Sequence, residues 1–87
     1  MLRLKTAMAK PKSTRRSPTA ISRALGKRVR LLRVERGWSI EHLAERADIH
    51  NTYLSSIENG NRNPTLNVLA DLARALNSTV SKLTDGI

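Results

Sequence analysis

Residues 39–64 contain two short amphipathic segments separated by a tight turn, and this pattern constrains the fold more than any other part of the chain. The first segment starts at Ile40, where Ser39 can cap the free amides of the first turn. Trp38 and Leu43 stand at the spacing of a hydrophobic staple across that start. The pattern predicts two short helices joined by a turn over about residues 40–59.

The second of these helices is expected to follow Asp48, with His50 as its N-cap. That start places Ile49 and Leu54 at staple spacing, whereas a cap at Asn51 would lose the apolar contact. The residues expected to close the space between the two helices are Leu43, Ala44, Ala47, Leu54 and Ile57. The outer face of the second helix then carries uncharged polar groups suited to base edges, which are Asn51, Thr52, Tyr53 and Ser56.

A longer helix is predicted before this pair, from about Thr19 or Ala20 to Arg36, where Gly37 supplies a stop. Its buried stripe, at helical spacing, is Leu25, Val29 and Leu32.

Two more helices are predicted after Pro64, the first capped by Thr65 and the second, shorter one by Thr79. The apolar positions that fit one face of the first are Leu66, Leu69, Leu72, Ala73 and Leu76. Asn77 stands where a left-handed residue is needed, a conformation that Asn tolerates better than most residues. The shorter helix is expected to end near Gly86.

A chain of 87 residues can form one small domain, which buries only about 60% of its unfolded surface. Because it has no cysteine, its stability must come from an aliphatic core. It has neither an apolar stretch long enough to span a bilayer nor a secretion signal. We therefore expect a cytoplasmic protein that binds no membrane.

The net charge of +9 is unevenly distributed. Residues 1–38 contain twelve Lys and Arg and one acid, whereas residues 39–87 contain four and six. This asymmetry is typical of a nucleic-acid-binding protein, although a basic surface also aids solubility. Residues 1–20, with six basic residues, no acid and two prolines, are predicted to be a disordered arm rather than a transit peptide. Met8 is an alternative start to Met1.

These segments resemble the Cro and phage-repressor type of helix-turn-helix regulator, also called the xenobiotic-response-element family, from about Leu25 to Leu83. The matching positions are Leu25-Gly26, Arg33, Gly37, Leu43-Ala44, Ile49, Leu54, Ile57-Glu58, Gly60, Arg62-Asn63-Pro64, Leu69, Leu72-Ala73 and Leu76. Residues 50–63 look most like controller proteins of restriction-modification systems. The resemblance implies an all-α, compact five-helix lambda-repressor-like DNA-binding domain over residues 21–87, with the motif at about 40–59.

The resemblance also assigns roles to individual residues. Those it places at base edges are Asn51, Thr52 and Ser56, with Tyr53 beside them. Those it places at phosphates are Ser39, His50, Asn59, Asn61 and Arg62. Without the motif, the same short polar residues would be read as a solvated helix face.

In the family, positions matching Arg33 and Glu58 form a partly buried salt bridge that fixes the angle of the reading helix. Two positions depart from the family pattern. Ile40 replaces a Gln that braces the recognition helix. Asp48 replaces a turn Gly, so the turn is either strained by about 1 kcal/mol or differently shaped. His42 and His50 lie on different predicted helices without a third ligand, so no metal site or cofactor is expected.

The function predicted first is a bacterial, nucleoid-associated homodimer that regulates transcription from a roughly palindromic site in double-stranded DNA. The alternative is an antitoxin-like protein that binds a partner toxin and represses its own operon. Leu31 and Val34, which lie off the buried stripe, are either scattered exposed aliphatics or part of such a contact surface. An enzyme is not expected, because the chain lacks a convergent set of acid and base residues.

Overall fold

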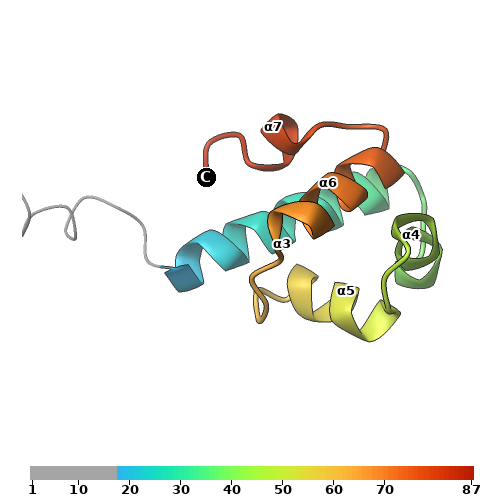
Figure 1. The fold of residues 1–87 in the computed structure, drawn as a ribbon, viewed down its shortest axis with the longest axis horizontal. Helices are drawn as coiled ribbons and strands as arrows, with labels where there is room; N and C mark the ends of the chain where they lie inside the picture. The colour runs from blue at the N-terminus through green and yellow to red at the C-terminus, as the bar shows by residue number, and fades with distance from the viewer. Residues whose placement is uncertain (1–17) are drawn as a thin grey trace, which may run out of the picture.

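The computed structural model describes residues 18–87, and every regular element in that range is a helix. The five elements are α3 (Pro18–Glu35), α4 (Ile40–Ala47), α5 (Asn51–Glu58), α6 (Leu66–Ala75) and α7 (Val80–Leu83). Helix α3 runs through the centre, with α5 below it and α7 above it in the view of Figure 1. Helix α4 packs on α5 and α6. The expected all-α fold is confirmed.

Helix α3 begins at Pro18, slightly before the predicted start at Thr19 or Ala20, and ends at Glu35 rather than Arg36. Proline suits the first position of a helix, because its missing amide would have no intrahelical partner there. The prediction that residues 18–20 belong to a disordered arm is therefore wrong. The rest of that predicted arm, and the choice between Met1 and Met8 as the start, lie outside the described residues.

The core is a single aliphatic cluster contributed by all five described helices. Its largest fully buried side chains are Val29, Leu43, Leu54, Ile57, Leu72, Leu76 and Leu83. Leu66 was predicted to share this face but is 70% exposed. It occupies the first position of α6, whereas the buried positions of that helix begin at Leu72. The helical spacing of apolar residues predicts the side of the helix on which a side chain lies. It does not predict whether a packed helix covers that side at that position.

Four helices end with a residue in the left-handed conformation. These residues are Gly37, Asp48, Gly60 and Asn77, with φ values of 71°, 59°, 79° and 55°. Backbone amides just after each of these helices donate to carbonyls of its last turn. After α4, for example, the Ile49 amide donates to the Ala44 carbonyl at 3.0 Å. The expected left-handed residue at Asn77 is confirmed. At Asp48, where a differently shaped turn was the alternative, the backbone is left-handed as well.

Three helices begin with a hydroxyl cap, as predicted. The side chains of Ser39, Thr65 and Thr79 accept from the amides of His42, Val68 and Lys82 at 3.0, 3.2 and 3.1 Å. Within residues 18–87 no helix has the length and hydrophobicity needed to cross a bilayer.

Candidate nucleic-acid interface

The start of α5 differs from the starts of α4, α6 and α7. His50 is its N-cap, as predicted, with extended φ and ψ of −70° and 143°, but its side chain makes no capping hydrogen bond. The first-turn amides of α5 therefore keep their hydrogen-bonding capacity. Free amides and the positive end of a helix dipole suit an anion such as phosphate.

The outer face of α5 is polar and carries no charged side chain. Asn51 and Thr52 are exposed, and Ser55 and Ser56 are half-buried. The Thr52 hydroxyl donates to Asn51 Oδ1 at 3.4 Å, which leaves the side-chain Nδ2 of Asn51 free to donate. These groups include both donors and acceptors, as reading of base edges requires.

Tyr53 contributes less to this face than the motif suggests. Its ring is half-buried and packs against the core, and the Arg62 guanidinium lies 5.4 Å from the ring centroid. The contact orients Arg62 at the far end of α5. Tyr53 therefore borders the polar face and also makes a cation–π contact with Arg62.

A shallow hollow of about 230 Å³ separates the start of α4 from the outer face of α5. Ile40 lines it opposite Asn51, Thr52 and Ser55, at the position where the family usually has a bracing Gln. The side chain of Glu41, which the motif does not mark as a DNA-facing residue, also lines the hollow. Its carboxylate is an acceptor beside the polar outer face of α5, and a carboxylate of this kind can accept from the amino group of cytosine.

The segment after α5 holds three of the predicted phosphate-binding residues. Asn59, Asn61 and Arg62 are exposed and surround Gly60, which turns the chain with its positive φ. Nearby, the buried Ser22 hydroxyl donates to Asn63 Oδ1 at 3.3 Å and ties this segment to α3. Four of the five predicted phosphate-binding residues thus fall into two groups, with His50 at the start of α5 and Asn59, Asn61 and Arg62 after its end. The fifth, Ser39, caps α4.

Arg33 and Glu58 form the ion pair that the resemblance implies. Arg33 Nε donates to Glu58 Oε2 at 2.7 Å and Arg33 Nη2 donates to Oε1 at 2.9 Å, a bidentate arrangement. The third donor, Nη1, bonds the Trp38 carbonyl at 2.8 Å. The side chains are only 12% and 4% exposed, and hydrogen bonding to Glu58 raises the pKa of Arg33 above its usual value. The pair joins the end of α5 to α3.

Gly26 brings α3 and α5 into close contact at the same end. A Cβ atom there would lie 2.3 Å from the Ile57 carbonyl oxygen and 2.6 Å from that of Glu58. Only a residue without a side chain permits this approach. The carboxyl end of α5 is thus held rigidly, while its first turn faces outward.

Other arginines bind the carbonyl ends of helices, and the sequence patterns did not predict them. Arg46 Nε donates to the Ala75 carbonyl at 3.0 Å with its guanidinium 4.5 Å from the Trp38 ring centroid. Arg36 Nη2 donates to the Leu76 carbonyl at 2.7 Å. The His42 ring meets the Trp38 ring edge-on, with the two ring centroids 4.8 Å apart. Within residues 18–87, no three His, Cys, Asp or Glu residues gather as metal ligands.

Comparison with known proteins gives consistent matches. The helix-turn-helix family profile matches residues 29–83. The control protein C.SmaI of Serratia marcescens is 44% identical over 63 residues, which cover 72% of this chain and 75% of that protein. The transcriptional regulator SinR of Bacillus subtilis is 39% identical over 70% of this chain and 56% of its own length.

Solved structures agree with these matches. The restriction-modification controller protein C.AhdI from Aeromonas hydrophila superimposes with a TM-score of 0.72 at 34% identity, covering 74% of this chain and 97% of that protein. SinR in its complex with the SinI protein gives a TM-score of 0.68 at 36% identity, covering 71% and 61%. The matched proteins are controllers and regulators of transcription and not enzymes.

Proposed function

We propose that this chain, which belongs to the helix-turn-helix family of Cro and phage-repressor type, acts as a homodimer on a roughly palindromic operator. Its family consists of DNA-binding transcriptional regulators and not of enzymes. The observation that carries the proposal is the outer face of α5, which combines free polar groups with an uncapped first turn. A helix of this kind fits the major groove.

In this proposal the two kinds of contact have separate places. Asn51, Thr52 and Ser56 read base edges, and Tyr53 borders them. Phosphates are held before and after these residues by Ser39, His50, Asn59, Asn61 and Arg62. The hydroxyl of Ser39 keeps a proton to donate to phosphate, because its oxygen is the acceptor in the cap. The Arg33–Glu58 pair sets the angle of α5.

The short outer face of α5 supports the proposal of a dimer. One α5 helix offers only two turns to the DNA, so two copies on the same face of the duplex double the contacts. Major grooves on one face recur every ~34 Å, or about 10 base pairs. The operator is therefore expected to be an inverted repeat with half-sites about one helical turn apart.

Selection of bound duplexes from a random library tests this function directly. The expected result is enrichment of an inverted repeat, with two protein chains per duplex in sedimentation. Enrichment of a single unrepeated half-site bound by one chain would refute the dimer, and no enrichment at all would refute sequence-specific binding.

A partner-binding role is the second candidate. Leu31 and Val34 are 52% and 55% exposed on α3, one turn apart, and SinR has been solved in complex with a second protein. We propose that these residues contact a toxin-like partner encoded nearby. Co-purification of a neighbouring gene product, lost in Leu31→Ser/Val34→Ser while operator binding persists, would support this role. Absence of any co-purified product would refute it.

A further inference from the structure

The basic side chains of residues 18–87 differ in whether their N–H groups already bond to other atoms of the protein. Several arginines donate to oxygen atoms of the protein itself; these are Arg28, Arg33, Arg36, Arg46 and Arg74. Arg23 and Lys27 are exposed, and their side chains make no hydrogen bond or ion pair with any residue in this range. Their charges are free to hold an external anion.

Arg23 lies beside the segment that follows α5. A Cβ atom built on Gly60 would be 3.0 Å from Arg23 Cα and 3.1 Å from its Cγ, so the two residues are in direct contact. Gly60 stands between Asn59 and Asn61 in the group proposed to bind phosphate. Arg23 therefore continues that group from the loop onto α3.

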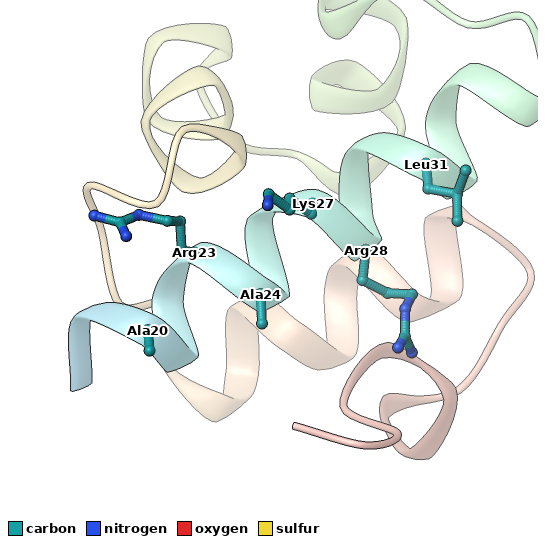
Figure 2. Close-up of a pocket in the computed structure, with 6 residues that line it drawn as sticks. All are labelled: Ala20, Arg23, Ala24, Lys27, Arg28 and Leu31. Carbon is teal, nitrogen blue, oxygen red and sulfur yellow. The ribbon is translucent and has the colours of Figure 1, made fainter. Parts of the chain in front are cut away.

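Lys27 extends the same line by one helical turn. Figure 2 shows Arg23 reaching across the loop after α5 and Lys27 further along α3, whereas Arg28 points toward α7. A shallow hollow of about 400 Å³ lies along this face, because Ala24 contributes only a methyl group. An extended anionic strand can lie in such a hollow between the two cations.

We propose that Arg23 and Lys27 bind the phosphate backbone that flanks the bases read by α5. This inference rests on the proposed function, and it extends the interface onto a helix outside the helix-turn-helix motif. DNA backbone is favoured over an acidic protein partner because Arg23 is continuous with the phosphate-binding loop. Phosphate contacts position the protein without reading sequence.

Charge removal gives a quantitative test. Arg23→Gln/Lys27→Gln is compared with Arg74→Gln/Lys82→Gln, which removes the same charge from exposed residues of α6 and α7. Binding to a duplex recovered by the selection is measured at several salt concentrations. Each lost phosphate contact flattens the plot of log affinity against log salt by about 0.9, so the first variant should lose about 1.8 in slope and the control almost none.

Three results would overturn the proposal. One is an unchanged slope in Arg23→Gln/Lys27→Gln, and another is an equal loss in the control variant. The third is a loss confined to the selected duplex and absent on a mixed-sequence duplex of equal length. Urea unfolding of each variant confirms that the fold is intact. If the unmodified chain binds no DNA, the proposed function fails as well, whereas normal binding with an unchanged slope refutes only the role of Arg23 and Lys27.

Discussion

Helices α4 and α5 are both eight residues long and each buries three residues, but they differ in how their polar groups are used. Ser39 caps α4, and two of its outward side chains are engaged: Arg46 bonds the Ala75 carbonyl, and His42 contacts Trp38. In α5 the N-cap side chain makes no bond, and the outward groups have few partners within the described chain.

The difference separates a helix whose polar groups are satisfied within the protein from one whose polar groups are left free, as the proposed contact with DNA requires. A polar group that is satisfied inside the protein stabilises the fold but has little left to offer a ligand. In α5 the satisfied polar interactions gather at the carboxyl end, where Arg33, Glu58 and Gly26 fix it to α3. Its first turn keeps free donors. In the proposed function, attachment at one end positions α5 on DNA without using the free groups at its other end.

The largest expected effect concerns that attachment. Glu58→Gln or Arg33→Met alone leaves a nearly buried group without its partner and should lower the free energy of unfolding by up to about 3–5 kcal/mol. This is a large part of the stability of a small domain. The double variant should recover some of the loss, because neither charge then remains buried alone.

Urea unfolding of the four proteins measures the coupling between the two residues. A coupling energy near zero would mean that Arg33 and Glu58 act independently. The packing of α3 on α5 would then depend on Gly26 and apolar contacts alone. Gly26→Ala provides the comparison, since it removes no charge but forces the two helices apart.

The next effect concerns the outer face of α5. Replacing Asn51, Thr52 or Ser56 singly by Ala should weaken binding to the selected operator by about 1–3 kcal/mol, with a much smaller change on mixed-sequence DNA. Fluorescence anisotropy on both duplexes measures the difference. Equal losses on the two duplexes would assign the residue to phosphate contact or folding instead of base reading.

Local features of the fold could be predicted from the sequence because they depend on residues only a few positions apart. The caps at Ser39, Thr65 and Thr79 need a hydroxyl and an amide three residues later. The left-handed conformation at Asn77 depends on the residue itself, whereas the turn at Asp48 was inferred from the resemblance. The same reasoning placed His50 at the start of α5.

Contacts between distant segments could not be predicted in this way. Arg36 and Arg46 reach carbonyls at the end of α6, and Arg23 lies against Gly60, but these contacts exist only once the helices are packed. The Arg33–Glu58 pair was expected from a resemblance and not from spacing. Leu66 shows the opposite error, because its helical position suggested burial where no neighbouring helix covers it.

The residues of the candidate site remain a prediction. Of the four that the motif places on the outer face of α5, Asn51 and Thr52 are exposed, Ser56 is half-buried and Tyr53 packs against the core. The structure adds what lies beside them, including Glu41 in the hollow and Lys27 on α3. Which bases the outward residues contact remains a prediction, because that depends on the DNA and on the second copy of the chain.

The smallest effect tests the two helix starts against each other. Ser39→Ala removes a cap that accepts from His42 at 3.0 Å and should destabilise the fold by about 1 kcal/mol. His50→Ala removes no capping bond, so the free energy of unfolding should change by only about a few tenths of a kcal/mol.

His50→Ser would instead supply a hydroxyl acceptor to the free amides of α5. It should therefore stabilise the fold and compete with phosphate for the same donors. Urea unfolding together with DNA binding should therefore find His50→Ser more stable and weaker on both selected and mixed-sequence DNA. A gain in stability without any loss of affinity would mean that the first turn of α5 does not contact the backbone, and the contrast between the two helices would then be one of folding alone.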